Sequence, residues 1–259
     1  MKTDFFKYQG AGNDFVIIDN RKLLFPKNDA KRINTLCDRK FGIGADGLML
    51  LEESDRADFR MIYYNADGNE GSMCGNGGRC IVAFAKSLDI FDKNTSFEAL
   101  GEMYTASFRA DQVSLKMTDV NKIDIHTDHV FLDTGSPHHI EFTDNLSTFD
   151  VFNQGREIRY GAPYFEAGTN VNFVEKINDT TFKVRTYERG VENETLSCGT
   201  GVTAAALACF HTNKTREKSI DIDTLGGKLH VAFDKQNGSY SNIILTGPAT
   251  FVYKGSISF

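Results

Sequence analysis

The stretch FRMIYYNADGNEGSMCGNGG (residues 59–78) has a second copy in the chain, FKVRTYERGVENETLSCGTG (residues 182–201). With a gap of one residue, Tyr64 aligns with Tyr187, Asn65 with Glu188, and Cys74 with Cys198. In both copies a strand-like segment leads through a polar loop to Cys-Gly-x-Gly, and an apolar, helix-prone run follows. An internal repeat on this scale indicates two copies of one supersecondary unit.

Outward from these copies, the pattern alternates strands and helices along the whole chain. Helices are predicted at 29–40, at 78–88 and in the Ala-rich run 198–212. Strands are predicted in the first half at 4–9, 14–19, 47–54, 58–65, 94–101, 103–110 and 112–117, and in the second half at 130–135, 138–142, 169–177, 181–188, 219–233, 240–247 and 249–259. No low-complexity linker separates the halves, so a boundary near 118–120 is inferred from the repeat.

Composition narrows the class of protein. The 259 residues are 41% hydrophobic and 25% charged, which suits a globular chain of one large or two smaller domains. The net charge of −6 predicts neither nucleic acid nor an anionic membrane surface as a partner. No apolar run approaches the ~20 residues of a membrane span. The N-terminal MKTDFFKYQGAGND becomes polar too early for a secretory signal, so we expect a cytoplasmic protein.

The five cysteines divide into two groups. An odd number in a long chain argues against a disulfide framework. Cys37, Cys80 and Cys209 lie inside helical runs and are predicted to be core residues. Cys74 and Cys198 instead stand at helix starts, where the macrodipole should lower a thiol pKa from ~8.5 into the range ~3.5–7.5. A buried, inert cysteine is the usual alternative, and the two matching Gly-rich frames argue against it.

A pair of thiols at helix ends that can each hold a carboxylate suggests one reaction. A thiolate removes the proton from one face of an α-carbon, and a thiol on the other face delivers one. The helix ends stabilise the charge that develops on the carboxylate. Such a site inverts a stereocentre without a cofactor, and the internal repeat suits a reaction that runs from either face. Equivalent loops of two facing copies would meet at their interface, a common place for a small-molecule site.

Other motif matches carry no function. The pairs His126/His129 and His138/His139 lack the clustered Cys or Asp that a structural zinc site needs, so no metal is expected. GIGADG (42–47) fits the dinucleotide pattern but follows a charged segment and leads into a strand. NADGNEG (65–71) begins like a calcium loop but places Glu70 where that loop needs glycine.

The chain resembles the diaminopimelate epimerase family in six segments that follow the family order. They are KYQGAGNDFVIID (7–19), FGIGADGLMLLE (41–52), YNADGNEGSMCGNGGRC (64–80), TGSPHH (134–139), GTNVNFVE (168–175) and YERGVENETLSCGTG (187–201). The resemblance implies an α+β fold of two pseudo-symmetric α/β domains, each a sheet curled around a central helix, with the site in the cleft between them. The predicted domains are residues 1–118 joined by the C-terminal strand 250–259, carrying Cys74, and residues 119–249, carrying Cys198.

The resemblance also implies an activity, the interconversion of LL- and meso-diaminopimelate without a cofactor, in the supply of lysine and peptidoglycan precursors. Cys74 and Cys198 would be the acid/base pair. Backbone donors to the substrate carboxylate would come from Gly75, Asn76, Gly199 and Thr200, and the family positions that hold the substrate correspond to Asn13, Asn65, Asn170, Glu188 and Arg189. The expected partner is this small molecule, and a homodimer is expected, with a monomer left open.

The sequence departs from the family at three places. Ser136 stands where many members have Asn, Gly47 stands where some have Gln, and the loop 190–197 is one residue longer than in common bacterial members. None of these changes touches the cysteine pair.

Four rival functions remain open on the sequence. Proline or hydroxyproline racemases share the implied fold, but they need no grip such as Glu188 and Arg189 for a distal amino-carboxylate. Phenazine-type isomerases lack the two cysteines. A thiol–disulfide redox protein would show C-x-x-C, which does not occur here. A non-catalytic amino-acid-binding module is compatible with the fold but has no use for two thiols.

Overall fold

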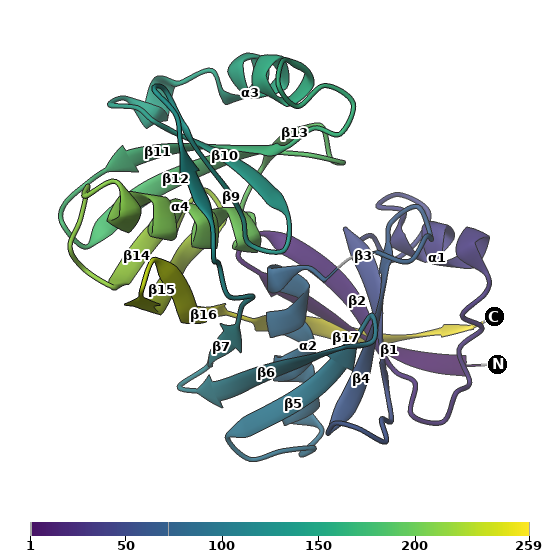
Figure 1. Cartoon of the computed structure of the whole chain (residues 1–259). Helices are drawn as coiled ribbons and strands as arrows, with labels where there is room; N and C mark the ends of the chain where they lie inside the picture. The colour runs from purple at the N-terminus through teal and green to yellow at the C-terminus, as the bar shows by residue number, and fades with distance from the viewer. Residues whose placement is uncertain (1, 72, 259) are drawn as a thin grey trace. The chain divides into compact units, whose positions relative to one another are not determined.

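A computed structural model describes residues 2–71 and 73–258, and it has the predicted mixed α/β character, with many strands and few helices (Figure 1). Ser72, inside the first cysteine motif, lies outside the described residues. The chain divides by its contacts into two compact units. Unit 1 comprises Met1–Leu115 and Gly247–Phe259, and unit 2 comprises Lys116–Thr246.

Unit 1 consists of one sheet and two helices. Its strands are β1 (Lys2–Gly10), β2 (Asn13–Asp19), β3 (Gly47–Glu52), β4 (Phe59–Asn65), β5 (Asn94–Ala99), β6 (Glu102–Arg109), β7 (Gln112–Lys116) and β17 (Thr250–Ser258), and its helices are α1 (Ala30–Cys37) and α2 (Gly75–Ser87). The strands pair in the order β17-β1-β2-β3-β4-β5-β6-β7, parallel at β2–β3 and β4–β5 and antiparallel elsewhere. Because α2 contacts strands towards both ends of this order, the sheet wraps around it (Figure 1).

Unit 2 is built from the elements between β7 and the end of β16. Its strands are β8 (Ile123–Ile125), β9 (Val130–Asp133), β10 (Pro137–Phe142), β11 (Asn170–Lys176), β12 (Thr181–Glu188), β13 (Asn193–Thr195), β14 (Ser219–Thr224), β15 (Gly227–Gln236) and β16 (Ser239–Pro248). Its helices are the 3-10 turn η1 (Leu146–Thr148), α3 (Val151–Tyr160) and α4 (Gly199–His211). The strands pair in the order β8-β9-β10-β11-β12-β14-β15-β16, and β13 adds to the end of β12.

The two units share one pairing pattern. In unit 2 the parallel pairs are β10–β11 and β12–β14, and they stand where β2–β3 and β4–β5 stand in unit 1. The helix α2 leaves β4 and the helix α4 leaves the β12–β13 hairpin, so each follows the equivalent strand. The repeat seen in 20 residues of sequence therefore extends over whole units, and the predicted fold class is confirmed.

The central helices α2 and α4 are buried over most of their length, α4 because it is apolar on nearly all sides and α2 with Asn76 and Arg79 enclosed among its apolar residues. In α4 the run Val202–Cys209 is buried without interruption, and in α2 only the last turn, with Lys86 and Ser87, becomes partly accessible. A helix that is apolar all round belongs in a core. Both helices start directly after a cysteine, and this fixes where the two cysteines lie.

The helix α3 is the main element that the sequence pattern did not predict. Its polar sequence hides the helical period, but Asp150 caps it by accepting a hydrogen bond from Asn153 N at 3.2 Å. Gly155 brings it close to β12, since a Cβ at this residue would lie 2.4 Å from Tyr187 Cβ. Tertiary packing on Tyr187 thus determines this helix.

No helix in the part of the chain that the structure describes combines the length and apolar character that a membrane span requires.

Candidate active site

Cys74 is the residue at which an extended segment turns into α2. Its backbone is extended (φ −105°, ψ 125°), and its carbonyl oxygen accepts the first helical hydrogen bond, from Gly78 N at 2.7 Å. The positive end of the helix dipole therefore lies at Cys74, next to the N–H groups of Gly75 and Asn76. The Cys74 side chain is half-buried. This geometry suits the binding of an anion close to the sulfur.

Cys198 has the same position at the start of α4. Its backbone is extended (φ −120°, ψ 114°), and its carbonyl oxygen accepts from Val202 N at 2.8 Å. The sulfur lies 3.4 Å from Thr200 Oγ1, and the residue is 8% exposed. Thr134 Oγ1 donates to the Thr200 carbonyl oxygen at 2.9 Å, which ties the first turn of α4 to the end of β9.

The three other cysteines are core residues, as predicted. Cys37, Cys80 and Cys209 are at most 3% exposed. Burial raises the pKa of Cys37 and of Cys80 to about 12 and raises that of Cys209 further. These thiols stay protonated at neutral pH and have no part in proton transfer.

Two predicted substrate residues of unit 1, Asn13 and Asn76, are in direct contact. Asn76 Nδ2 donates to Asn13 Oδ1 at 2.6 Å, and Asn13 Nδ2 donates to Asp46 Oδ2 at 3.0 Å. Since a carboxylate can only accept, Asp46 fixes which end of the Asn13 amide faces Asn76. Asp46 was not predicted as a site residue. It comes from the loop before β3, and nothing in its local sequence identifies it.

The Asp46 carboxylate belongs to a charged cluster that is internally neutral. Arg39 binds Asp14 through both carboxylate oxygens, at 2.7 and 3.0 Å, and Asp46 Oδ1 at 2.7 Å. Lys7, only 6% exposed, lies 2.6 Å from Asp14 Oδ2 and also donates to the Gly44 carbonyl. Burial alone raises the pKa of Asp14, but the hydrogen bonds and charges of Arg39 and Lys7 outweigh it and lower this pKa to about 2.

In unit 2 the structure brings together Asn170 and Arg189. Asn170 Oδ1 accepts from Arg189 N at 3.0 Å, and Asn170 Nδ2 donates to Ser136 Oγ at 2.9 Å and to the Pro137 carbonyl at 3.0 Å. The Arg189 guanidinium donates to the Ala167 carbonyl at 3.0 Å and lies 3.4 Å from Ser136 Oγ. Ser136, a departure from the family pattern, therefore supports Asn170.

Asn65 and Glu188, which align in the repeat, occupy equivalent positions in the two units. Asn65 ends β4 and is exposed, and Glu188 ends β12 and is half-buried. Glu188 Oε2 accepts from Thr195 Oγ1 at 2.8 Å, across the β12–β13 hairpin. The hairpin therefore holds this carboxylate in place.

His138 is a functional candidate that the sequence analysis did not predict as a site residue. It is fully buried, and its Nδ1 lies 3.0 Å from Asn172 Nδ2. The same Nδ2 faces the His139 carbonyl oxygen at 3.2 Å, which can only accept, so the amide nitrogen is the donor to both. His138 Nδ1 is therefore an acceptor, and the ring proton is on Nε2.

The Nε2 atom of His138 is buried and has no hydrogen-bond partner within residues 2–71 and 73–258. Burial, with a smaller contribution from the charge of Arg189, lowers the pKa of His138 to about 3. The ring is thus neutral at physiological pH. A buried donor without a protein partner is uncommon, so the Nε2–H of His138 is a candidate for contact with a ligand or a bound water.

The histidines that could suggest a metal site are arranged otherwise. His126, His129 and His139 stack face to face, with ring centroids 4.3 and 4.1 Å apart. Among the residues that the structure describes, no group of three His, Cys, Asp or Glu side chains is arranged to hold a metal ion.

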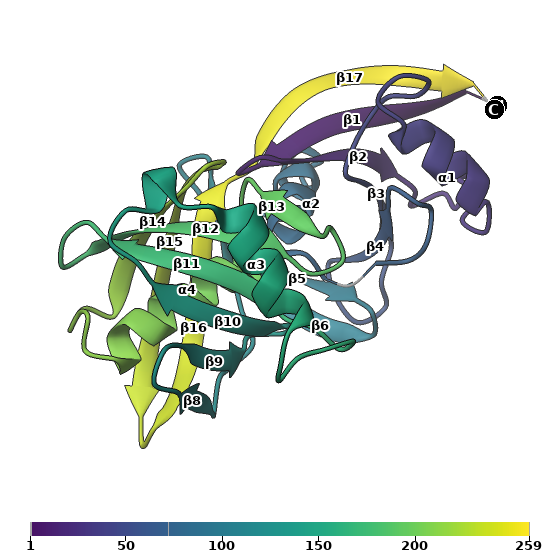
Figure 2. The same ribbon diagram turned by 90° about the horizontal axis from the view of Figure 1, so that it is seen from above.

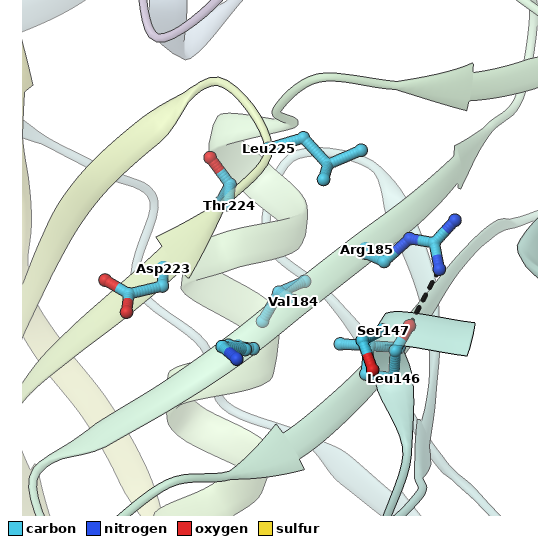
Figure 3. A pocket seen from close by; sticks show the side chains of 8 residues that line it. Leu146, Ser147, Val184, Arg185, Asp223, Thr224 and Leu225 are labelled. Carbon is cyan, nitrogen blue, oxygen red and sulfur yellow. Dashed lines mark hydrogen bonds between the residues drawn. The ribbon is translucent and has the colours of Figure 1, made fainter. Parts of the chain in front are cut away.

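A pocket of about 200 Å³ in unit 2 lies apart from the predicted site residues (Figure 3). Its lining consists of Leu146, Ser147, Lys183, Val184, Arg185, Asp223, Thr224 and Leu225. Arg185 is engaged by the structure itself: it binds both oxygens of Glu194 at 2.6 and 2.7 Å, and it donates to the Leu146 carbonyl at 2.7 Å. We assign this pocket no catalytic role.

Comparison with known proteins agrees with the sequence pattern. A family model described as "Diaminopimelate epimerase" matches residues 5–123 and 130–252. The diaminopimelate epimerase of Flavobacterium psychrophilum is 54% identical over 253 residues, which cover 97% of this chain and 99% of that protein. The diaminopimelate epimerase of Chlorobaculum tepidum is 45% identical over 259 residues, which cover 96% and 99%.

Solved structures with the same fold are more distant in sequence. A phenazine biosynthesis protein of the PhzF family from Bacillus anthracis superposes with a TM-score of 0.79 at 13% identity, over 100% of both chains. A hydroxyproline epimerase from Agrobacterium vitis superposes with a TM-score of 0.70 at 15% identity, over 99% of this chain and 92% of that one.

The fold and the sequence relatives together define an isomerase of the epimerase class. Within that class, the chain belongs to the diaminopimelate epimerase family. The resemblance stated from the six sequence segments is thereby confirmed.

Proposed function

We propose that this protein interconverts LL-2,6-diaminopimelate and meso-2,6-diaminopimelate, with Cys74 and Cys198 as the two bases. The observation that carries the proposal is the pair of matching frames, Cys-Gly-x-Gly at the start of each central helix, in a chain 54% identical to the F. psychrophilum enzyme. The product would supply lysine and peptidoglycan synthesis. In this proposal residues 1–118 with 250–259 form the domain of Cys74, and residues 119–249 form the domain of Cys198.

The reaction needs one thiolate and one thiol. The thiolate takes the α-proton, so that an S–H bond forms as the C–H bond breaks, and the carbanion takes a proton from the opposite thiol. In the reverse direction the two sulfurs exchange roles. Protons balance in this scheme without an oxidant or a cofactor. We therefore expect the reaction to need no cofactor.

Charge development is the main barrier to this chemistry, because the proton on an α-carbon next to a carboxylate is weakly acidic. Two helix N-termini aimed at one carboxylate would stabilise the charge as it builds. Gly75 and Asn76 at α2, and Gly199 and Thr200 at α4, belong to these first turns. They are our candidates for its backbone donors.

The distal amino acid group of the substrate would be held by the remaining predicted residues. Arg189 can bind a carboxylate through two parallel hydrogen bonds, and Glu188 can accept from an ammonium group. Asn13, Asn65 and Asn170 complete the polar set. Ser136 and Asp46 would not contact the substrate themselves. Each would orient the amide of an asparagine that does, Ser136 that of Asn170 and Asp46 that of Asn13.

The first test is substrate choice. Purified, reduced protein should epimerise LL-diaminopimelate and leave L-proline unchanged, and the substrate α-hydrogen should exchange with deuterium oxide during turnover. Turnover of L-proline alone would favour the proline racemase alternative. Absence of both activities, together with disulfide exchange activity, would favour a thiol–disulfide redox protein.

The proposal includes a reducing, cytoplasmic location. Five cysteines, three of them buried as thiols in the core, suit a compartment that keeps catalytic thiols reduced. Activity that requires reductant in the assay would agree with this, and full activity after exposure to oxidised glutathione would count against it.

The proposal also includes a homodimer formed through β17. Within the described residues this strand pairs only with β1 (Figure 2). Its Phe251, Val252 and Tyr253 side chains are 48%, 52% and 42% exposed. A long apolar edge strand is normally covered by a partner. Light scattering should give twice the chain mass for the native protein and the monomer mass for Tyr253→Asp. A monomer in both cases would contradict the homodimer.

A further inference from the structure

Arg79 is a fully buried arginine in the second turn of α2. It is 0% exposed and is the largest completely buried side chain in the described part of the chain. Placing an isolated guanidinium in a protein core is costly unless a negative charge compensates it. The identity of that compensating charge therefore bears on the role of this residue.

The hydrogen bonds of Arg79 go to neutral oxygens. Its Nη2 donates to Asn76 Oδ1 at 2.8 Å, its Nη1 to the Gly75 carbonyl at 3.3 Å, and its Nε to the Pro248 carbonyl at 3.5 Å. These bonds curl the side chain back to the first turn of the helix. No ion pair joins Arg79 to a carboxylate among residues 2–71 and 73–258.

The carboxylates that hydrogen bonds link to the first turn of α2, Asp46 through Asn13 and Asp14 through Arg39, are already neutralised. Asp14 and Asp46 carry two negative charges, and Lys7 and Arg39, which bind them directly, carry two positive ones. Tyr8 on β1 stays protonated because burial raises its pKa.

Two thiols remain near the guanidinium, and each would stabilise its positive charge if it were ionised. They are Cys80, the next residue in the helix, and Cys74, which precedes the first turn. Burial raises the pKa of Cys80 to about 12, so Cys80 is neutral at physiological pH. Cys74 is half-buried and lies at the positive end of the helix dipole, so it is the group that can ionise.

The equivalent position in unit 2 has no charge. The alignment of Cys74 with Cys198 places Thr203 opposite Arg79, and each side chain donates to the carbonyl of the glycine after its cysteine. Thr203 Oγ1 reaches the Gly199 carbonyl at 2.9 Å and is fully buried. Cys198 does contact the Thr200 hydroxyl, but a hydroxyl can accept from a thiol as well as donate to a thiolate.

We infer that Arg79 determines which cysteine is ionised in the resting enzyme. Its buried positive charge stabilises Cys74 as the thiolate, while Cys198 rests as the thiol. The inference rests on the proposed two-thiol function and adds an asymmetry to it. The free enzyme is poised for the substrate isomer whose α-proton faces Cys74, and the other direction requires the charge to move to Cys198 first.

The test measures the pH dependence of alkylation at each cysteine separately. Reduced protein is treated with iodoacetamide across pH 5–10, and mass spectrometry gives a rate for each cysteine-containing peptide. The pH midpoint of each rate reports ionisation and, unlike the rate itself, does not depend on how accessible the sulfur is. The Cys74 midpoint should lie at least one pH unit below the Cys198 midpoint, which is about a tenfold difference in thiolate-to-thiol ratio.

Two variants separate the charge of Arg79 from its hydrogen bond to Asn76. Arg79→Gln keeps a donor but removes the charge, so it should raise the Cys74 midpoint by about one pH unit or more and leave the Cys198 midpoint in place. Arg79→Lys keeps the charge and should stay close to the native midpoint. Thr203→Val is the matched control in α4 and should leave the Cys74 midpoint unchanged.

Two results would overturn the inference: a Cys198 midpoint below that of Cys74 in the native protein, or an unshifted Cys74 midpoint in a folded Arg79→Gln variant. Circular dichroism verifies folding, and the native measurement stands if a variant does not fold. Failure of the proposed function is distinguishable, because it would appear as absent epimerisation with the Cys74 midpoint still low.

Discussion

Asn76 donates a side-chain hydrogen bond to Asn13 at 2.6 Å, and this contact joins the start of α2 to the start of β2. Its direction is set by Asp46, which accepts from the other end of the Asn13 amide. Two residues predicted to bind substrate are thus held in one orientation by a carboxylate that binds no substrate in our proposal.

Replacing Asp46 should therefore impair substrate binding from a distance. Asp46→Asn removes an obligatory acceptor and one partner of Arg39, so the Asn13 amide loses its fixed direction. Loss of one charge-assisted hydrogen bond predicts a kcat/KM for LL-diaminopimelate that is roughly 10- to 100-fold lower. Asp19→Asn, which breaks the surface pair with Arg21, is the control. A kcat/KM within twofold of native for Asp46→Asn would contradict this role.

Each of the two proposed catalytic cysteines should be indispensable. Cys74→Ala and Cys198→Ala each remove one of the two bases, so epimerisation should fall below detection in both. The measurement is conversion of LL- to meso-diaminopimelate by chiral chromatography. Cys37→Ala, a buried cysteine outside the proposed chemistry, should remain active. Full activity in either catalytic variant would exclude the two-thiol mechanism.

The first turns of α2 and α4 offer a matched pair of glycine substitutions. At Gly201 a Cβ would lie 2.3 Å from Asn172 Oδ1, whereas at the equivalent Gly77 the nearest atom, Met49 Sδ, would be 3.4 Å away. Gly201→Ala should therefore lower the free energy of unfolding by about 1–3 kcal/mol, and Gly77→Ala should be neutral or stabilising by up to about 1 kcal/mol. Urea unfolding of both variants tests this, and equal effects would refute it.

Asp14 should make stability depend on acid pH. Its pKa in the folded protein, about 2, lies below that of an unfolded aspartate, so the unfolded chain binds the proton first as pH falls. The stabilisation is full above about pH 4 and is lost as pH falls towards 2, and it amounts to about 2 kcal/mol. Asp14→Asn should therefore differ from the native protein in urea unfolding at pH 7, and the difference should shrink at pH 3. A constant difference would contradict the assignment.

His138 should remain neutral in mildly acidic solution, with its proton on Nε2. Since its pKa in the folded protein is about 3, the unfolded chain takes up this proton first, below about pH 6.5. Above that pH the titration of His138 does not change the free energy of unfolding. Below it, the free energy of unfolding decreases by about 1.4 kcal/mol per pH unit towards pH 3. The nitrogen chemical shifts of the His138 ring at pH 5 report both its protonation state and which nitrogen carries the proton. A protonated ring, or a proton on Nδ1, would show that Asn172 does not fix the tautomer.

The elements around the two cysteines were predictable because local pattern and tertiary role agree there. An apolar run of helical length after Cys-Gly-x-Gly indicates a buried helix, and both α2 and α4 are found. The helix α2 was predicted to start at Gly78, three residues after its observed start at Gly75. The Gly-Asn-Gly-Gly start has low helix propensity, and burial in the core overrides it.

Elements that depend on distant contacts could not be read from local sequence. The segment 190–197 was predicted as a loop, yet β13 forms in it by pairing with β12, and Glu194 of β13 binds Arg185 of β12 at 2.6 Å. The same limit applied to the site. The roles of Asp46 and Asn172 are set by partners far along the chain, Asn13 and His138, and no spacing rule connects them.

The return of β17 to β1 has a consequence for the order in which the protein can be built (Figure 2). Synthesis delivers the residues of unit 2, Lys116–Thr246, before the strand that completes the sheet of unit 1. Until that strand has left the ribosome, one edge of β1 lacks its native partner, although β1 is made before all of unit 2. A nonsense mutation before β17, or a fusion that disturbs this strand, therefore acts on unit 1 and on the helix that bears Cys74.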